Sequence, residues 1–295
     1  MSTLKIIEPT YLYTILNQYL FYSNLSNPRY LLLLDARIKD EYNECHIIMA
    51  KRMKKNDKND YIVPYDSELE CQEKIVVYDG NTNSLDPSSE AVKCANVLLT
   101  NGARNGVLIL KGGYEYFSRL YPFLRTQKIL WMPRELDTYH PFPLEVIPQS
   151  LYLGNSRHAC DKYVQKQLKI KCHVNCTTEI NEIFESTNEN LFDVKVSDNP
   201  ESNIGIYFDD VCSFIDKNRK EGKRVFVYSH LGISRAPVII MAYLMHLEEI
   251  SLAKSWSYLK SISSVMRPNR GFVSQLSEYE KKFVAEPTYT EDPFY

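Results

Sequence analysis

The feature that most constrains this chain is a short polar loop between two apolar segments. Residues 224–227 have the β-branched and aromatic content of a buried strand, and residues 236–247 have the continuous apolar content of a buried helix. The first turn of a helix leaves backbone N–H groups unpaired, and such groups bind anions. The sequence therefore predicts a strand, an anion-binding loop and a helix, with Arg235 placed to pair with the anion. We call this segment the 229–235 loop; it consists of Ser229, His230, Leu231, Gly232, Ile233, Ser234 and Arg235.

The spacing of this loop resembles the Cys-x5-Arg motif of the cysteine-dependent phosphatases. Arg235 stands at the arginine position, and Gly232 stands at a tight turn where a positive φ favours glycine. Ser229 occupies the position of the nucleophilic cysteine, and Tyr228 occupies that of the histidine that precedes it in the family. None of the chain's seven cysteines is followed by an arginine at this spacing. The loop therefore keeps the predicted anion-binding residues and lacks the nucleophile.

Replacing a thiol by a hydroxyl changes what this position can do. A helix N-terminus and nearby cations lower a cysteine pKa from about 8.5 to roughly 3.5–7.5, which produces a thiolate. A serine hydroxyl titrates near the value of water, about 15.7, and stays protonated after a similar shift. A serine nucleophile therefore needs an adjacent base. His230 is the candidate, and a Ser229–His230 hydrolase is an alternative, although neighbouring side chains in an extended segment point apart.

Length and composition define the class of protein. The 295 residues are enough for two domains, and a hydrophobic content of 44% is that of a globular protein. A net charge of −2 gives no general attraction to nucleic acid, and no apolar run is long enough for membrane insertion. The odd number and irregular spacing of the cysteines predict reduced thiols, and we expect neither a metal nor a cofactor. Because the first residues lack the apolar stretch of a signal peptide, we expect a cytoplasmic protein, with the mitochondrion and the nucleus as alternatives.

Prolines are dense between residues 133 and 147, which breaks regular structure and indicates a linker. We expect one domain at 1–132, the linker at 133–147, a second domain at 148–285 and a C-terminal tail at 286–295. On each side of the linker, apolar strands alternate with amphipathic helices, which indicates two α/β domains with buried sheets. The expected strands are 30–34, 75–78, 107–110, 174–176, 192–196 and 224–227. The expected helices are 90–100, 204–219, 236–247 and 252–262.

Further motifs lie in order around the 229–235 loop. They are Ile-Pro-Gln-Ser-Leu-Tyr-Leu-Gly-Asn at 147–155, His-Val-Asn-Cys-Thr at 173–177, Ala-Tyr-Leu-Met at 242–245 and Arg-Pro-Asn-Arg-Gly-Phe-Val-Ser-Gln-Leu at 267–276. With the loop, they resemble the dual-specificity phosphatase family along the whole second domain, which implies its α/β/α fold. The resemblance gives Asp198, in Ser-Asp-Asn-Pro after a predicted strand, the place of the family's general acid. Without a nucleophile, we expect Asp198 to be vestigial, and a turn or helix-capping role is its alternative.

A second set of motifs lies in the first domain. It comprises Leu-Leu-Asp-Ala-Arg at 33–37, Glu-Tyr at 41–42, His-Ile at 46–47, Val-Val-Tyr-Asp at 76–79 and Leu-Lys-Gly-Gly-Tyr-Glu-Tyr-Phe at 110–117. These motifs resemble a rhodanese-like domain with a parallel sheet. An active sulfurtransferase carries a cysteine where Asp79 stands, and a carboxylate cannot carry a persulfide, so the resemblance implies an inactive domain. We expect Asp35, Arg37 and His46 to be structural polar groups.

A basic cluster follows the His-Ile motif of the first domain. A rhodanese-like domain ahead of a dual-specificity domain is the arrangement of the MAP kinase phosphatases, whose first domain docks the kinase through basic residues. The resemblance implies a docking role for the cluster, with Met53 as an interleaved apolar contact. The cluster consists of Lys51, Arg52, Lys54 and Lys55. The alternative is a solvated charged loop, because acidic and amide residues follow at 56–60 and dilute the charge.

The chain as a whole resembles the pseudophosphatases related to the MAP kinase phosphatases. We expect a catalytically inactive regulator or scaffold in phosphorylation-dependent signalling, which competes with or modulates active phosphatases or kinases. The expected partners are signalling proteins: phosphorylated proteins, phosphatases or MAP kinases. The alternatives are a weak residual protein phosphatase and a pure protein-interaction module that does not bind phosphate.

Overall fold

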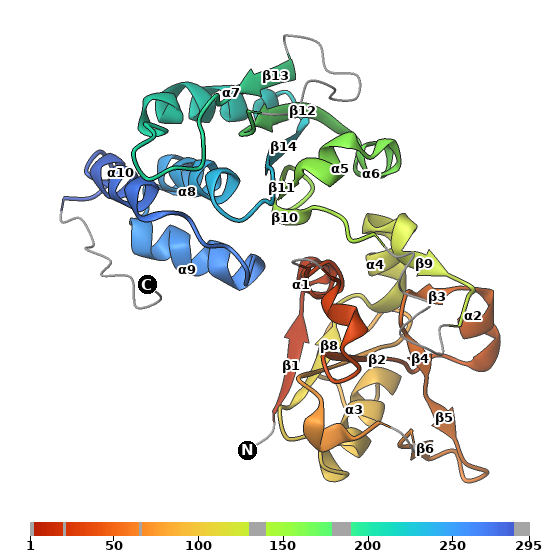
Figure 1. Ribbon diagram of the computed structural model, residues 1–295. Coiled ribbons are helices and arrows are strands. Elements are labelled where there is room, and N and C mark those ends of the chain that lie inside the picture. The colour runs from red at the N-terminus through yellow and green to blue at the C-terminus, as the bar shows by residue number, and fades with distance from the viewer. Residues whose placement is uncertain (1–2, 20–21, 65–66, 130–139, 179–189, 286–295) are drawn as a thin grey trace. The chain divides into compact units, whose positions relative to one another are not determined.

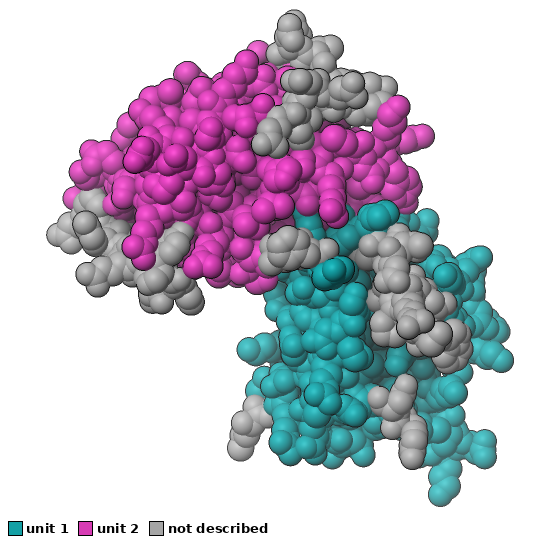
Figure 2. Space-filling model, viewed as in Figure 1, with its two compact units in different colours: residues 1–141 teal, residues 142–295 magenta. Residues whose placement is uncertain are grey.

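The computed structural model describes residues 3–19, 22–64, 67–129, 140–178 and 190–285 (Figure 1). The chain divides into two compact units, Met1–Pro141 and Phe142–Tyr295 (Figure 2). The boundary falls inside the predicted linker, but the prediction that this linker extends to residue 147 was wrong. Leu144–Ile147 form a strand of unit 2, because they pair with the strand that follows them. Residues 133–139 and the predicted tail at 286–295 lie outside the described residues.

Unit 1 is built on a five-stranded parallel sheet with the strand order β1-β8-β7-β2-β4. Its strands are β1 (Leu4–Ile7), β2 (Leu31–Asp35), β4 (Lys51–Arg52), β7 (Lys74–Tyr78) and β8 (Val107–Leu110). The strands predicted at 30–34, 75–78 and 107–110 are therefore confirmed. Two short antiparallel pairs accompany the sheet: β3 (His46–Ile47) with β9 (Arg125–Thr126), and β5 (Lys54–Lys55) with β6 (Tyr61–Ile62).

Helix α3 (Glu90–Thr100) forms where the sequence predicts it, and it covers one face of this sheet. Ser89 caps the helix by accepting the N–H of Val92 at 3.2 Å. Its core-facing side chains recur at helical spacing. They are Ala91, Cys94, Ala95 and Leu98. The other described helical segments of unit 1 are α1 (Pro9–Leu16), α2 (Lys39–Glu44), α4 (Gly113–Leu120), and the 3-10 turns η1 (Asn24–Ser26), η2 (Leu69–Cys71) and η3 (Pro122–Leu124).

Unit 2 contains a second five-stranded sheet, with the order β10-β11-β14-β12-β13 (Figure 1). Its strands are β10 (Leu144–Ile147), β11 (Leu151–Asn155), β12 (Ile170–Asn175), β13 (Leu191–Asp193) and β14 (Arg224–Ser229). β10 is antiparallel to β11, and the remaining pairs are parallel. In the strand order of this sheet, β14 is the central strand. The strand predicted at 192–196 ends early at Asp193, because the N–H of Val196 donates to the Val194 carbonyl oxygen at 3.0 Å in a tight turn.

Helix α8 (Arg235–Glu248) follows β14 and is buried from Arg235 to Met245. Figure 1 shows it between α7 and α9, and α7, α9 and α10 all pack against it. The other described helical segments of unit 2 are α5 (Ser156–Cys160), α6 (Lys162–Leu168), η6 (Gly205–Tyr207), α7 (Phe208–Lys220), α9 (Leu252–Ile262) and α10 (Arg270–Glu280). The helices predicted at 236–247 and 252–262 are confirmed, and the one predicted at 204–219 begins with the 3-10 turn η6. In the part of the chain that the structure describes, no helix has both the length and the apolar character needed to cross a membrane.

Candidate functional site

The 229–235 loop joins the carboxyl end of β14 to the first turn of α8, as the sequence predicts. Gly232 has a φ of +75°, and a Cβ at this position would lie 2.6 Å from the carbonyl oxygen of Gly154. Both observations require glycine here. The Ile233 carbonyl oxygen accepts the N–H of Arg267 at 2.7 Å, which fixes the loop to the segment before α10.

Ser229, at the predicted nucleophile position, lies at the end of the central strand and is only 3% exposed. Its Oγ accepts the N–H of Gly232 at 3.2 Å, so the hydroxyl faces into the loop and stabilises it. His230, in contrast, is exposed. The two side chains differ in exposure as neighbouring residues of an extended segment should. This geometry does not favour a Ser229–His230 hydrolase.

Tyr228 is fully buried beneath the loop. Its ring stacks on Phe226 at a centroid distance of 5.2 Å and meets the edge of His173 at 6.4 Å. Burial raises the pKa of Tyr228 well above its ordinary value. A neutral phenol at this position cannot supply the positive charge that stabilises a neighbouring thiolate. Leu231, within the loop, is 47% exposed.

Asp198, the predicted vestigial general acid, contacts the 229–235 loop directly. Its Oδ1 accepts the hydroxyl of Ser234 at 2.7 Å and the side-chain amide of Asn269 at 2.8 Å. Its Oδ2 lies 3.8 Å from Nε of Arg235. Arg235 also donates through a terminal nitrogen to the Val196 carbonyl oxygen at 3.1 Å. The structure thus brings the predicted acid and arginine together, but both already have partners within the protein.

Val196 and Asn269 are site residues that the sequence reasoning missed. Asn269 lies in the predicted Arg-Pro-Asn motif, and its Oδ1 also caps α10 by accepting the N–H of Phe272 at 3.0 Å. An asparagine before a helix signals a cap in the sequence, but its second contact, to Asp198, joins residues far apart in the chain. Val196 contributes only its carbonyl group, which leaves no signature in the residue type.

In unit 1, Asp79 stands at the carboxyl end of β7, where an active sulfurtransferase carries its cysteine. It is buried and accepts four hydrogen bonds. Three come from its own loop: the N–H of Asn81 at 3.2 Å, and the N–H and hydroxyl of Thr82 at 2.9 and 2.5 Å. The fourth comes from the N–H of Ala91 in the first turn of α3, at 3.1 Å. The carboxylate therefore fills the anion position of this loop itself.

The polar residues predicted to be structural in unit 1 have internal partners. The guanidinium of Arg37 meets the fully buried carboxylate of Asp35 at 2.6 Å and donates to the Cys45 carbonyl oxygen at 2.8 Å. His46 is buried, bonds the Tyr42 carbonyl oxygen through Nδ1 at 2.9 Å and stacks on the ring of Tyr42. These contacts agree with a structural role for Asp35, Arg37 and His46.

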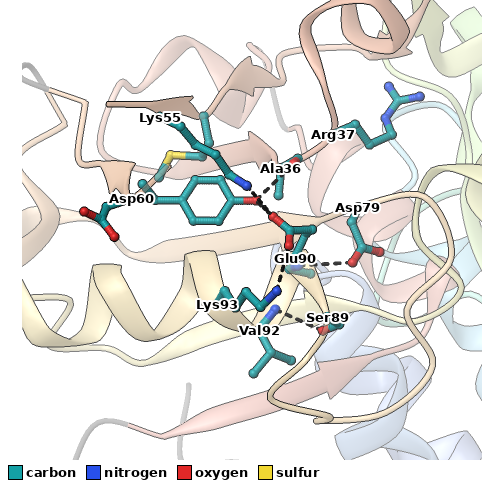
Figure 3. A network of polar contacts seen from close by, with 12 residues as sticks. Ala36, Arg37, Lys55, Asp60, Asp79, Ser89, Glu90, Val92 and Lys93 are labelled. Carbon is teal, nitrogen blue, oxygen red and sulfur yellow. Dashed lines mark hydrogen bonds and ion pairs between the residues drawn. The ribbon is translucent and has the colours of Figure 1, made fainter. Parts of the chain in front are cut away.

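The predicted basic cluster lies on β4 and β5 at one side of unit 1, and its members differ in their surroundings. Lys51, Lys54 and Lys55 are exposed and Arg52 is half-buried, and Nζ of Lys55 pairs with the Glu90 carboxylate at 2.6 Å (Figure 3). The expectation that Met53 offers an apolar contact to a partner was wrong, because Met53 is 2% exposed and packs in the core. Alternation along an extended strand turns it inward between its basic neighbours.

Glu90 is the centre of a polar network in Figure 3. Its carboxylate accepts hydrogen bonds from Lys55, from the Tyr61 hydroxyl at 2.6 Å and from Lys93 at 2.9 Å. These bonds, led by the one from Lys55, lower the pKa of Glu90 to about 2. Beside it, a groove of about 730 Å³ lies at the carboxyl ends of β2 and β7. Its lining mixes charges of both signs, including Arg52, Lys54, Asp79 and Glu115.

The buried cysteines are not suited to replace the predicted nucleophile of the 229–235 loop. All seven are free thiols, and Cys94, Cys172, Cys176 and Cys212 are buried. Burial raises the pKa of the Cys176 and Cys94 thiols far above the ordinary value, and that of Cys212 to about 12. Thiols of this kind stay protonated and unreactive. Among the described residues, no group of three or more His, Cys, Asp or Glu side chains is arranged to hold a metal ion.

Unit 2 is a mixed sheet flanked by helices, with the 229–235 loop between its central strand and α8 and with Ser229 at the predicted nucleophile position. Residues 151–282 match the family model described as "Dual specificity phosphatase, catalytic domain", and residues 18–120 match the "Rhodanese-like domain". The chain thus combines a region that matches the rhodanese-like domain with a region that matches the dual specificity phosphatase catalytic domain. The predicted domain order and fold class are confirmed.

Similar proteins include dual specificity phosphatases, one of which is also named for a rhodanese domain. Dual specificity protein phosphatase 1-A of Xenopus laevis is 28% identical over 294 residues, which cover 86% of this chain and 79% of that protein. A probable rhodanese domain-containing dual specificity protein phosphatase of Dictyostelium discoideum is 29% identical, over 61% of this chain and 38% of that protein. The structure of the human tyrosine phosphatase-like serine/threonine/tyrosine-interacting protein is 29% identical, with a TM-score of 0.43, over 48% of this chain and 95% of that chain.

Proposed function

We propose that this protein is a catalytically inactive pseudophosphatase that regulates phosphorylation-dependent signalling by binding, as a competitor or scaffold for active enzymes. The observation that carries the proposal is Ser229 at the position of the nucleophilic cysteine. Phosphoryl transfer to this site would need a nucleophile ionised near neutral pH, and a serine hydroxyl is not one without an adjacent base. The proposal includes a cytoplasmic location.

The surroundings of Ser229 support this proposal. Its hydroxyl accepts a hydrogen bond from Gly232, and the residue before it, Tyr228, is a buried neutral phenol. Asp198, which would protonate a leaving group, is instead bound to Ser234 and Asn269. Each group of the expected reaction is therefore either replaced or engaged within the protein.

A second candidate function is a protein-interaction module that does not bind phosphate. It is favoured by the contacts of Arg235, whose guanidinium already bonds the Val196 carbonyl oxygen and faces the Asp198 carboxylate. The two candidates differ in whether a phosphorylated peptide binds better than the same peptide without phosphate. Arg235→Lys, which keeps the charge but loses the planar donor pair, should weaken only phosphate-dependent binding.

For partners, we propose phosphorylated proteins, phosphatases or MAP kinases, with exposed Lys51 and Lys54 contributing to docking. Exposed charges of this kind increase the association rate more than the affinity. The double variant Lys51→Glu, Lys54→Glu should slow association with a MAP kinase in stopped-flow measurements. Lys58→Glu, an exposed lysine in the adjoining turn, is the matched control. Equal slowing by the control, or none by the double variant, would contradict docking at this cluster.

The first experiment compares aryl-phosphate hydrolysis by the purified protein and by the Tyr228→His, Ser229→Cys double variant. We expect no hydrolysis by the parent and measurable hydrolysis by the double variant, and we expect thiol alkylation to abolish the activity of the variant. A parent with turnover that resists alkylation would overturn the proposal and indicate a serine mechanism or a weak residual phosphatase. A folded double variant without turnover would mean that the rest of the site has also been lost.

A further inference from the structure

The 229–235 loop has the geometry of an anion site, but a carboxylate of the protein already lies beside it. Asp198 reaches the loop from the segment between β13 and α7. One of its oxygens accepts the Ser234 hydroxyl at 2.7 Å and the Asn269 amide at 2.8 Å. Its other oxygen lies 3.8 Å from Nε of Arg235. The negative charge is thus placed next to the cation that would bind a phosphate.

The arginine has an unused donor on this side. The side chain of Arg235 is 10% exposed, and its Nε has no hydrogen-bond partner among the described residues. A distance of 3.8 Å is too long for a hydrogen bond, so Asp198 neutralises Nε without satisfying it. A buried donor without a partner is unfavourable, and an oxyanion in the loop would remove that penalty. The unpaired Nε of Arg235 therefore favours phosphate binding, and the negative charge of Asp198 opposes it.

We propose that Asp198 acts as an internal competitor, and that the 229–235 loop binds a phosphate monoester well only when this carboxylate is displaced or neutralised. The proposal rests on the pseudophosphatase function and specifies how that same site is regulated. Asp198 is able to move away, because its side chain is 37% exposed and lies in a segment without regular structure. A phosphorylated partner that also contacts the segment around Asp198 binds, whereas free phosphate binds weakly.

The test measures binding of inorganic phosphate to the full chain by isothermal titration calorimetry at neutral pH. Asp198→Asn removes the charge and keeps an oxygen to accept the Ser234 hydroxyl. Glu201→Gln is the matched control, because it removes the same charge from an exposed residue of the same segment. The double variant Asp198→Asn, Arg235→Lys tests whether the gain in binding comes from this arginine. Melting temperatures of all variants establish that each is folded.

We expect Asp198→Asn to bind phosphate about tenfold or more tightly than the parent, because a unit charge close to the site is removed. Glu201→Gln should match the parent, and the double variant should lose the gain. Equal affinity of Asp198→Asn and the parent, a similar gain with Glu201→Gln, or an unchanged gain in the double variant would each overturn the proposal. If the parent itself binds phosphate tightly, internal competition fails while phosphate recognition stands. The turnover assay on the parent tests catalytic inactivity independently.

Discussion

Each unit ends a central parallel strand in a loop that we predict to correspond to the cysteine loop of a related enzyme, and the residues at the predicted cysteine positions, Asp79 and Ser229, have different surroundings. After β7, Asp79 accepts four hydrogen bonds from its own loop and from α3. After β14, Ser229 contributes a small hydroxyl that accepts the N–H of Gly232. The first substitution fills the anion position with a carboxylate and turns the loop into structure. The second leaves the loop geometry in place, with its opposing charge supplied by Asp198 from a distant segment.

The largest expected effect follows from this difference. Restoring Tyr228→His and Ser229→Cys together should raise aryl-phosphate hydrolysis by about 10³-fold or more over the parent, because nucleophile and oriented donors act as a unit. Ser229→Cys alone should give a small part of this gain, and Tyr228→His alone none. Steady-state kinetics on the three variants would check this order. Equal rates for the two single variants would mean that the thiol is not the nucleophile.

Removing the carboxylate from the other loop should destabilise unit 1. Asp79→Ala leaves the N–H groups of Thr82 and Ala91 buried without their acceptor, which should cost about 4 kcal/mol of unfolding free energy. Hydrogen exchange of α3 would report the loss locally. Asp79→Asn, which keeps an acceptor oxygen, is the control and should cost less. A fully stable Asp79→Ala variant would show that this loop does not depend on its carboxylate.

The two units should also lose stability in different pH ranges. Burial lowers the pKa of His173 in unit 2 to about 4, so the folded state favours neutral imidazole. This contribution is complete above the unfolded pKa of about 6.5 and declines as the pH falls towards 4, by up to about 3 kcal/mol. Glu90 in unit 1, with a pKa lowered to about 2, loses its contribution only below its unfolded value.

Urea denaturation between pH 7 and pH 3 would separate these two contributions. His173→Gln, which cannot take a proton, should remove the part of the pH dependence between 6.5 and 4 while leaving the lower range unchanged. Glu90→Gln should remove the pH dependence in the lower range and leave the part between 6.5 and 4 unchanged. A parent and a His173→Gln variant with the same dependence above pH 4 would contradict the buried neutral state of His173.

The smallest effect is expected at Ser229 itself. Ser229→Ala removes an acceptor from the N–H of Gly232 and should cost about 1 kcal/mol, well below the cost of Asp79→Ala. Thermal melting of unit 2 would measure it. A loss as large as that of Asp79→Ala would mean that both loops depend equally on the residue that replaced the cysteine.

The structural features that depend on residues close together in the chain could be predicted from the sequence. The β14–loop–α8 arrangement follows from an apolar strand, a glycine needed at a positive φ and an apolar helix, and α3 follows from its serine cap and helical spacing. These elements could be predicted because each depends on neighbours in the chain.

The features that could not be predicted depend on contacts between distant segments. Nothing near Asn269 indicates that its amide donates to Asp198, and the carbonyl group of Val196 binds Arg235 whatever its side chain is. Met53 stands in a charged run that suggests exposure, yet it lies between β4 and β5 with its side chain packed in the core. Strand β10 could not be predicted, because the prolines before it indicate a linker and its antiparallel partner is supplied only by the folded sheet.

The buried hydroxyl of Ser229 has a consequence for how this protein responds to oxidants. A low-pKa thiolate at the end of β14 would be the first group in the unit to react with peroxide, and its oxidation would switch the site off. Here that position cannot be oxidised, and the nearby Cys176 is buried with a raised pKa that keeps it a protonated thiol. On the proposed function, oxidation of residue 229 or Cys176 would therefore not release a partner held at the 229–235 loop.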